Sequence, residues 1–333
     1  MSQLERHRLG KSDLVVSPVG LGCWAMGGPA IRVTGEERQP FGWGAVDDAE
    51  SIRGIHRALD IGANFVDTAN NYGAGHSERT LGRALEGRRH EVVLSTKFAT
   101  VFSEELQEVY FDRELPMTYG EIRAACEGSL RRLRTDYIDL YHFHNGEYPA
   151  EQAGEVRDIL ERLVEEGKIR WYGWSTDDPE RARVFAEGAH CATVQYRMNI
   201  TWDASKMIEL TRELGLGSVI RSPLNGGFLT GKFTPNTTFP EDDGRHSLNL
   251  GDGTAALRLR QIDLIRGILT EDGRSVAQGS LGWIWGKHPE AVPIPGFKSA
   301  AQVEENVTAA RYGPLSADQI GRIEALLAEV QTG

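Results

Sequence analysis

Short apolar segments alternate with longer amphipathic segments along most of this chain. The apolar segments, rich in β-branched and aromatic residues, are 19–23, 65–69, 92–98, 137–144, 171–176, 192–198, 218–224 and 291–296. The segments with helical periodicity are 47–62, 77–87, 119–136, 150–168, 178–188, 205–215 and 301–310. Such alternation predicts a parallel sheet covered by helices. Eight such strands, alternating with helices within 333 residues, predict a closed (β/α)8 TIM barrel that occupies residues 1–333 as a single domain.

Five segments lie outside this repeat. The N-terminal stretch "RHRLGKSDLVVS" (6–17) predicts a hairpin, and residues 316–330 predict a final helix that begins at a serine cap. The others are long loops at residues 27–44 and 99–118 and a long insertion at residues 225–275. Long loops in a compact domain are usually functional, and in a barrel the functional loops lie at the C-terminal face.

The composition disfavours several classes of protein. A net charge of −11 argues against binding to nucleic acid or to an anionic membrane surface. Three widely spaced cysteines, Cys23, Cys126 and Cys191, fit a reducing compartment better than a disulfide scaffold. The N-terminus lacks the apolar core of a signal peptide, and no apolar run reaches the roughly 18 residues of a membrane-spanning helix. We therefore expect a cytoplasmic protein that acts on a small molecule; its oligomeric state is not readable.

Polar residues gather at the C-terminal ends of the predicted strands, where barrel enzymes place their active sites. They are Asp67, Lys97, His142, His144, Ser175, Gln195, Arg221 and Ser222. Buried polar groups cost free energy unless they find partners, so a ring of them at one end is difficult to explain as packing alone. This end of the barrel is the expected active site.

Three of these residues and a tyrosine predict acid–base chemistry. Asp67 can pair with Lys97 from the neighbouring strand and hold it charged. The polar loop that follows returns Tyr72 over the barrel mouth, where the Lys97 ammonium is expected to lower the pKa of the phenol. His144, from the next strand, can bind the same substrate oxygen. The set suits proton donation to a carbonyl oxygen while a hydride reaches the carbon.

Five sequence motifs surround this site. They are "GANFVDTANNYGAGHSERTLG" (62–82), "LSTK" (94–97), "YIDLYHFH" (137–144), "SPLNGGFLTGK" (222–232) and "IPGFKSAAQVEEN" (294–306). In this order they resemble motifs of the aldo-keto reductases. The first is similar to that family's G-x-N-x-x-D-T-A-x-x-Y-G-x-x-x-S-E signature, the next two to its lysine strand and its D-L-Y-x-x-H strand, and the last two to its cofactor segments. The resemblance covers nearly the whole chain.

The resemblance implies a barrel that binds NADPH across its C-terminal face without a Rossmann domain. The catalytic tetrad that it implies is Tyr72 as general acid with Asp67, Lys97 and His144. The residues that it implies for the cofactor are Ser175, Thr176, Gln195, Arg221, Ser222, Pro223, Leu224, Gly227, Lys232, Arg245, Gly296, Lys298, Gln302, Glu305 and Asn306. Lys298, Gln302 and the helix N-terminus near Ala301 would bind the 2′-phosphate and favour NADPH over NADH.

Two positions depart from the family pattern. The residue after Ser175 is usually asparagine but is Thr176 here, and its hydroxyl offers fewer hydrogen bonds than an amide. The residue before "SPL" is usually an aromatic that stacks on the nicotinamide but is Arg221 here. Because a guanidinium is planar, we expect Arg221 to cover the nicotinamide ring or to reach a cofactor phosphate.

Three further interpretations fit single motifs. "GLGCWA" (20–25) matches a G-x-G-x-x-A dinucleotide fingerprint, but no helix is predicted directly after it. Tight backbone passage fits these glycines better, with Cys23 and Trp24 near the cofactor or substrate. His142 and His144 form an HxH pair that could begin a metal site, although few other ligands are available and we expect no metal. Lys97 could be a Schiff-base lysine, which its pairing with a carboxylate disfavours.

We therefore expect NADPH-dependent reduction of an aldehyde or ketone, with reversible alcohol oxidation and with Tyr72 as the general acid. The alternative on the same barrel is an NADPH-binding regulatory or sensor subunit, which the presence of His144 disfavours. We expect residues 27–44, 99–118 and 225–253 to determine substrate specificity, and no motif in these segments identifies the substrate. Trp24 and Trp43 are candidate walls of the substrate pocket.

Overall fold

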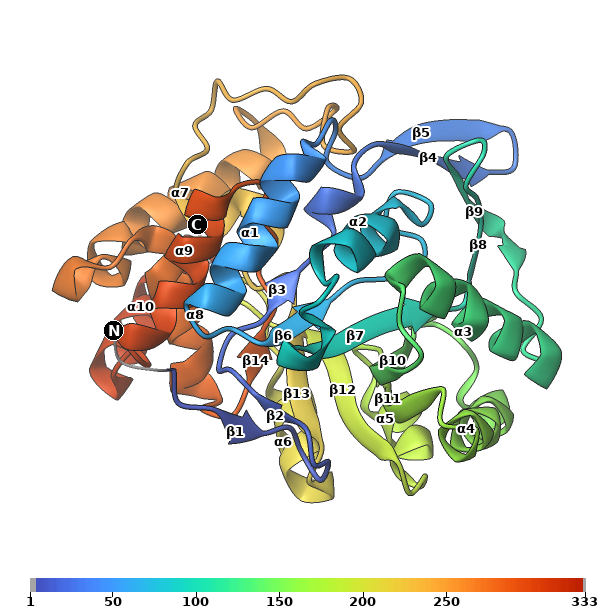
Figure 1. The fold of residues 1–333 in the computed structure, drawn as a ribbon. Coiled ribbons are helices and arrows are strands. Elements are labelled where there is room, and N and C mark those ends of the chain that lie inside the picture. Colours follow the sequence, from blue (N-terminus) through green and yellow to red (C-terminus); the bar gives the residue numbers. More distant parts are fainter. Residues whose placement is uncertain (1–3, 332–333) are drawn as a thin grey trace.

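The computed structural model describes residues 4–331. Its centre is an eight-stranded parallel sheet in the order β14-β13-β12-β11-β10-β7-β6-β3 (Figure 1). The strands are β3 (Leu21–Gly22), β6 (Phe65–Asp67), β7 (Val93–Phe98), β10 (Ile138–Phe143), β11 (Ile169–Ser175), β12 (Cys191–Arg197), β13 (Gly217–Arg221) and β14 (Val292–Pro293). Within this sheet each strand pairs with the one that follows it along the chain, as the strand–helix repeat predicts.

The two edges of this sheet meet at a seam that only glycine permits. Gly22 forms a parallel bridge with Gly296 and donates its N–H to the carbonyl of Pro295 at 3.0 Å. A Cβ on Gly22 would lie 2.5 Å from the carbonyl oxygen of Ile294. The sheet therefore curls until its edges join, and the predicted (β/α)8 barrel is confirmed.

The same seam decides between the two interpretations of "GLGCWA". The segment is followed by a single 3-10 turn, η1 (Ala25–Gly27), and then by a strand, instead of by a helix. A dinucleotide fingerprint must open a helix, so that interpretation is wrong here. The glycines allow the close backbone passage that closes the barrel.

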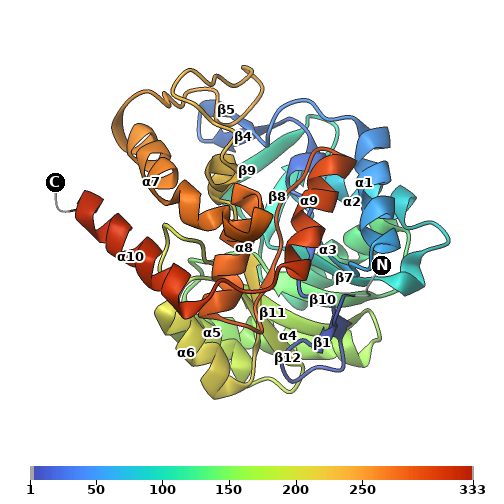
Figure 2. The same cartoon turned by 90° about the vertical axis from the view of Figure 1, so that its left-hand side faces the viewer.

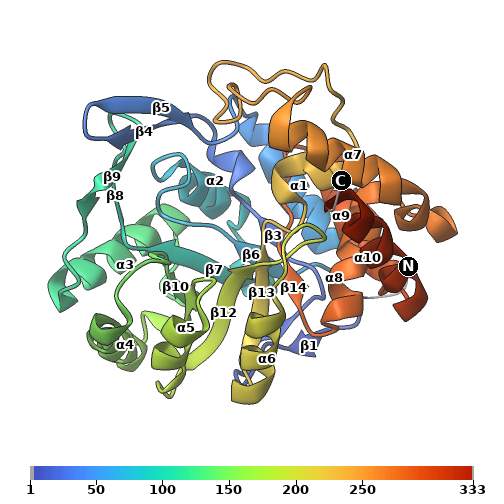
Figure 3. The ribbon, with the colours of Figure 1, turned by 180° about the vertical axis from the view of Figure 1, so that it is seen from behind.

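Helices cover the outside of the barrel (Figures 1 and 3). They are α1 (Asp48–Asp60), α2 (His76–Ala84), α3 (Tyr119–Leu133), α4 (Ala150–Glu165), α5 (Pro179–Ala186), α6 (Ser205–Leu214), α8 (Val276–Lys287) and α9 (Ala300–Thr308). Several begin at side-chain caps that satisfy their first amides. Asp47 caps α1, for example, and Ser275 forms a capping box with Gln278 at the start of α8.

The predicted terminal elements are both present. The N-terminal hairpin pairs β1 (His7–Arg8) with β2 (Val15–Val16), and its Leu9 and Leu14 pack with Phe65 and Val219 beneath the barrel. The final helix, α10 (Ala317–Gln331), packs against α7 (Gly253–Leu269) and α8 (Figure 2). No helix within residues 4–331 is both long enough and apolar enough to cross a lipid bilayer.

The expectation of plain loops at residues 27–44 and 99–118 is wrong. Their strands are β4 (Ala30–Thr34), β5 (Glu37–Phe41), β8 (Thr100–Ser103) and β9 (Glu108–Glu114). Two hairpins pair through parallel contacts between β4 and β9, giving a four-stranded sheet in the order β5-β4-β9-β8 beyond one end of the barrel (Figure 3). An isolated hairpin is marginal in water, so each depends on a partner about 75 residues away in the sequence.

The insertion at residues 225–275 is also more ordered than expected. It contains the 3-10 segment η3 (Asn225–Thr230), the helix α7 and a second 3-10 turn, η4 (Glu271–Gly273). The buried residues of α7 include Leu259, Ile262 and Ile265, which recur at helical spacing and give it an apolar face. The irregular part of the insertion is therefore confined to residues 231–252.

Candidate active site

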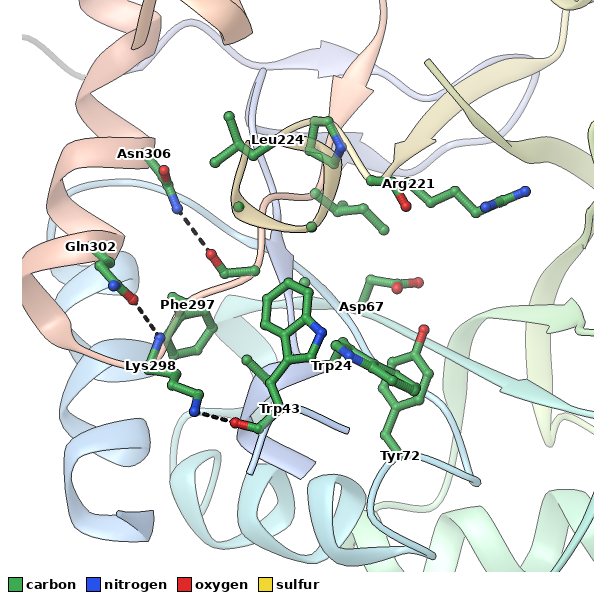
Figure 4. Close-up of a pocket in the computed structure, with 18 of the residues that line it drawn as sticks. Trp24, Trp43, Asp67, Tyr72, Arg221, Leu224, Phe297, Lys298, Gln302 and Asn306 are labelled. Carbon is green, nitrogen blue, oxygen red and sulfur yellow. Dashed lines mark hydrogen bonds between the residues drawn. The ribbon is translucent and has the colours of Figure 1, made fainter. Parts of the chain in front are cut away.

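A cavity of about 560 Å³ lies where the barrel strands end and the loops begin (Figure 4). The predicted site residues that line it are Trp24, Asp67, Tyr72, His144, Gln195, Arg221, Ser222, Pro223, Leu224, Gly227, Lys232, Arg245, Gly296, Lys298, Gln302, Glu305 and Asn306. The structure thus brings together one end of six strands and residues from the long insertion. The cavity has two parts, one around Tyr72 and one around α9.

A buried ion pair forms the floor of the first part. Lys97, near the end of β7, places its Nζ 2.5 Å from Oδ2 of Asp67, at the end of β6. The same ammonium donates to the carbonyl of Thr68 at 2.6 Å. The other oxygen of Asp67 accepts hydrogen bonds from Ser95 Oγ at 2.8 Å and from Gln195 Nε2 at 3.0 Å. Every hydrogen-bonding atom of this carboxylate therefore has a partner, which fixes its orientation.

Tyr72 lies directly over this ion pair. Its hydroxyl oxygen is 3.2 Å from Nζ of Lys97. The loop that carries it is held by a close backbone contact, because a Cβ on Gly73 would lie 1.8 Å from the carbonyl oxygen of Gly27. Gly73 also has a φ of +57°, which favours glycine. The predicted meeting of Asp67, Lys97 and Tyr72 is therefore observed.

The pKa of Tyr72 differs from the expectation in direction. Burial raises the pKa of the phenol, and the attraction of Lys97 opposes this without cancelling it, so the pKa lies above its ordinary value. Burial alone would lower the pKa of Lys97, but Asp67 and Tyr72 outweigh it and keep the pKa raised. Sequence alone could not weigh these effects, because the burial of the phenol depends on packing. At neutral pH Tyr72 holds its proton and Lys97 is charged.

His144 completes the predicted tetrad. Its backbone N–H donates to the carbonyl of Phe98 at 2.9 Å, and its ring centroid lies 6.1 Å from that of Tyr72. Burial, and then the charge of Lys97, lower the pKa of His144 well below its ordinary value, so the imidazole is neutral. Nδ1 is buried without a hydrogen-bond partner in the described part of the chain.

His142, the other member of the HxH pair, is a buried, hydrogen-bonded residue. Its Nδ1 lies 3.2 Å from Ser95 Oγ and its Nε2 lies 2.9 Å from Thr193 Oγ1. Both ring nitrogens therefore have hydrogen-bond partners within the protein. Across residues 4–331, no three His, Cys, Asp or Glu side chains are grouped so that they could hold a metal ion. Lys97, charged and paired, is likewise unsuited to Schiff-base formation.

Three of the predicted cofactor residues lie outside the cavity lining. Cys23 is fully buried, and its backbone N–H donates to the carbonyl of Asp67 at 2.9 Å. Ser175 and Thr176 are also buried, and the Thr176 hydroxyl donates to the carbonyl of Gly146 at 3.2 Å. Direct contact between these side chains and a bound molecule would need local movement.

Arg221 is held by a carboxylate at the rim of the cavity. Its guanidinium lies 2.5 Å from Oδ2 of Asp177, and the other oxygen of Asp177 accepts the backbone N–H of Arg197 at 2.7 Å. Burial lowers the pKa of Arg221, and Asp177 only partly offsets this. The planar cation is thus positioned within the electrostatic reach of Tyr72.

The second part of the cavity runs toward α9. The ammonium of Lys298 donates to the carbonyl of Trp43, and its backbone N–H donates to Gln302 Oε1 at 2.7 Å (Figure 4). Asn306 Nδ2 donates to the carbonyl of Gly296 at 3.3 Å. Lys232 lies 3.3 Å from Glu305. Positively charged side chains therefore lie along the groove, and Lys298 and Lys232 already have hydrogen-bond or ion-pair partners within the protein.

Two loops meet across this groove. Trp43 forms an antiparallel bridge with Asp243, and Gly244 donates to the carbonyl of Gly42 at 2.9 Å. Arg245 pairs with Asp243 at 2.7 Å and stacks on Trp43 with its guanidinium carbon 4.4 Å from the ring centroid. Residues 42–44 and 243–245 thus form a strap beside the cavity. Arg245, which the resemblance assigns to the cofactor, lies in this strap and lines the cavity.

A row of aromatic side chains lines the part of the cavity near Tyr72. Trp24 packs edge-on against Tyr72 at 4.9 Å and against Phe41 at 4.7 Å, and Phe41 packs against Phe111 at 5.4 Å between ring centroids. Phe41 and Phe111 belong to the four-stranded sheet. Sequence reasoning assigned their segments to substrate recognition but did not select these two residues. Their positions depend on the β4–β9 pairing, which no local pattern predicts.

The model of the Aldo/keto reductase family matches residues 18–328. The chain is 26% identical over 326 residues to the uncharacterized oxidoreductase YqkF of Bacillus subtilis, which covers 97% of this chain and 96% of that protein.

Two solved structures are similar throughout. The glycerol dehydrogenase AKR11B4 from Gluconobacter oxydans has a TM-score of 0.80 and 30% identity, covering 97% of this chain and 95% of that one. An aldo-keto reductase from Klebsiella pneumoniae in complex with NADPH has a TM-score of 0.68 and 26% identity, covering 98% and 96%.

Proposed function

The chain belongs to the aldo/keto reductase family and is an oxidoreductase, and from this premise we propose that it uses NADPH to reduce the carbonyl group of a small aldehyde or ketone. The observation that carries the proposal is the position of the Tyr72 hydroxyl, 3.2 Å from the ammonium of Lys97 and inside a cavity that His144 also lines. A Klebsiella pneumoniae relative is in complex with NADPH, which supports the choice of cofactor.

The side chains of this chain supply the proton and the orientation. NADPH, when bound, would supply a hydride to the carbonyl carbon and would be left as NADP+. Tyr72, protonated because burial raises its pKa, gives its proton to the oxygen. Lys97 stabilises the phenolate that remains, and Asp67 keeps Lys97 charged and fixed. The phenolate then regains a proton from water, and alcohol oxidation runs these steps in reverse.

The neutral protonation state of His144 defines its role in the proposed reaction. It is neutral, so it can orient the substrate oxygen by a hydrogen bond without competing with Tyr72 as the acid. The complete tetrad favours an enzyme over an NADPH-binding sensor subunit.

The groove toward α9 fits a dinucleotide. Lys232, Arg245 and Lys298 line it and could neutralise phosphates, as single charges do in many phosphate sites. Gly227, which also lines it, has a φ of +101°, which favours glycine, and a Cβ there would lie 2.8 Å from the Phe233 ring. Ser222, Pro223, Leu224, Gly296 and Asn306 complete the proposed cofactor set together with Gln195, Arg221, Gln302 and Glu305.

The substrate side of the cavity favours a carbonyl compound with an apolar arm. Trp24, Phe41 and Phe111 form a continuous apolar wall that starts at Tyr72 and ends at the rim, where Phe111 is 43% exposed. When an apolar group of the substrate covers this exposed aromatic surface, burial of the surface stabilises the complex.

The direct test is a reductase assay with NADPH and NADH over a panel of aldehydes and ketones. We expect NADPH-dependent turnover, and Tyr72→Phe should abolish it while NADPH still binds. Absence of turnover over the whole panel, with NADPH binding intact, would support the sensor alternative. Loss of NADPH binding in Tyr72→Phe would assign Tyr72 a structural role.

A further inference from the structure

A carboxylate from α1 caps the helix expected to bind the adenosine end of the cofactor. The helices α1 and α9 lie side by side at one edge of the barrel (Figures 1 and 2). Oε1 of Glu50 accepts the backbone N–H of Ala300, the first residue of α9, at 2.8 Å. The contact joins residues 250 positions apart in the sequence. Glu50 thus occupies an amide that the helix N-terminus would otherwise present to an anion.

The carboxylate is fixed in this position. Its other oxygen, Oε2, accepts from Nε of Arg53 at 2.9 Å. Beneath it, Gly54 packs so closely on Phe297 that a Cβ on Gly54 would lie 2.9 Å from the Phe297 ring. The hydrogen bond from Ala300, followed by that from Arg53, lowers the pKa of Glu50, so the group is charged at neutral pH.

The other groups expected to bind a 2′-phosphate also have partners within the protein. The ammonium of Lys298 donates to the carbonyl of Trp43 and lies 3.4 Å from that of Ala45. Oε1 of Gln302 accepts the backbone N–H of Lys298, and the backbone N–H of Gln302 donates to Ser299 Oγ at 3.3 Å. A 2′-phosphate that binds these groups must therefore displace several contacts within the protein. Of these contacts, the one between Glu50 and Ala300 involves a negative charge, which the phosphate also carries.

We propose that Glu50 is a cofactor-selectivity residue, whose carboxylate competes with the 2′-phosphate of NADPH for the N-terminus of α9. The proposal rests on the proposed use of a nicotinamide dinucleotide. One amide N–H cannot serve two anions, and a phosphate brought beside the carboxylate is repelled. NADH has a neutral hydroxyl at the same ribose position, which a carboxylate tolerates and can accept a hydrogen bond from. The chain therefore discriminates weakly between NADPH and NADH.

Glu50→Gln is the direct test, with dissociation constants measured by quenching of tryptophan fluorescence in the absence of substrate. The variant removes the charge and keeps the size. We expect the dissociation constant of NADPH to fall on the order of tenfold, the size of one charge-assisted contact, while that of NADH changes about twofold or less. Glu50→Asp keeps the charge but withdraws the carboxylate from Ala300, and we expect a smaller shift in the same direction.

Glu304→Gln is the matched control. Glu304 lies on α9 and pairs with Arg57 of α1 at 2.8 Å, so the variant removes one negative charge from the same pair of helices but away from the N-terminus of α9. We expect little change in the NADPH-to-NADH ratio. An equal shift in Glu304→Gln, or an unchanged ratio in Glu50→Gln, would overturn the proposal.

Fragments of the cofactor separate this proposal from the proposed function. Adenosine 2′-monophosphate and adenosine 5′-monophosphate both lack the nicotinamide, so their binding reports on the adenosine end alone. Glu50→Gln should strengthen binding of the 2′-monophosphate and leave the 5′-monophosphate unchanged. If both dinucleotides bind but Glu50→Gln leaves their ratio unaltered, only the selectivity proposal fails. If neither dinucleotide binds, the proposed function fails, and the selectivity proposal fails with it.

Discussion

Lys97 and Asp67 form an ion pair from which water is excluded, with Nζ and Oδ2 2.5 Å apart and the two side chains 0% and 2% exposed. In such a pair each charge stabilises the other, because either charge alone would be buried without compensation. The hydroxyl of Tyr72 lies 3.2 Å from Nζ of Lys97, so the stability of the barrel and the proposed chemistry of the site depend on the same ion pair.

Asp67→Asn should therefore lose both activity and stability. The buried ammonium of Lys97 would be left without a counter-charge, which costs about 3–5 kcal/mol of the free energy of unfolding. Urea denaturation followed by circular dichroism would measure this. The double variant Asp67→Asn with Lys97→Met should recover part of the stability but none of the turnover. If the double variant were as unstable as Asp67→Asn, burial of an unpaired charge would not be the cause.

Stability should decrease in weak acid because of His142. Burial, and then the charge of Lys97, hold the pKa of His142 well below its ordinary value of 6.5. Between pH 6.5 and 5 the unfolded chain binds a proton that the folded chain does not. The free energy of unfolding should therefore fall as the pH drops below 6.5, and above pH 7 it should not depend on the titration of His142. Comparing melting temperatures against pH for the wild type and His142→Gln isolates this contribution, with the exposed His90→Gln as control. Identical slopes for His142→Gln and the wild type would contradict the prediction.

Gly73→Ala should impair turnover by moving Tyr72. The new Cβ would lie 1.8 Å from the carbonyl oxygen of Gly27 in a backbone with a φ of +57°, so the loop must shift. We expect kcat to fall at least on the order of tenfold because a shift of about 1 Å in a catalytic group has effects of this size. Steady-state kinetics would measure it. Gly87→Ala has a comparable φ of +77° and no atom within 4 Å of the new Cβ, so it controls for backbone strain. Equal kinetic losses in the two variants would rule out the steric explanation.

Phe111→Ala should change which substrates are preferred. Truncation removes the outer end of the aromatic wall, so KM for an aryl aldehyde should rise by roughly five- to tenfold, the effect of losing about 1–1.5 kcal/mol of apolar contact. A small polar aldehyde that does not reach the rim should keep its KM. Leu106→Ala, at an exposed apolar residue in the turn between β8 and β9, is the control. If KM rose equally for both aldehydes, the wall would not be a substrate site.

Arg221→Ala should weaken NADPH binding. Arg221 lines the cavity and belongs to the proposed cofactor set, and its guanidinium lies 2.5 Å from Oδ2 of Asp177. Loss of the planar cation should raise the dissociation constant on the order of tenfold, the size of one charged contact. Asp177→Asn keeps the guanidinium of Arg221 but removes the carboxylate that holds it, and should raise the dissociation constant of NADPH by less. An unchanged dissociation constant in Arg221→Ala would remove Arg221 from the cofactor site.

The sequence by itself determines the barrel and most of the proposed catalytic set. Strand and helix periods are local properties of the chain, so eight alternating units could be read without knowing what they pack against. Polar residues at the ends of strands, such as Asp67 and Lys97, could be placed together because parallel strands end at one rim. Their meeting with Tyr72 follows from the length of one short loop.

Only the tertiary structure decided the features that depend on distant segments. The pairing of β4 with β9, which brings Phe41 and Phe111 to the cavity, joins two hairpins through contacts that neither segment encodes alone. The direction of the Tyr72 pKa depends on how much packing excludes water, which outweighs the nearby charge of Lys97. The contact between Glu50 and Ala300 exists because barrel closure sets α1 beside α9. Burial and long-range proximity are properties of the folded chain, so no local pattern could give them.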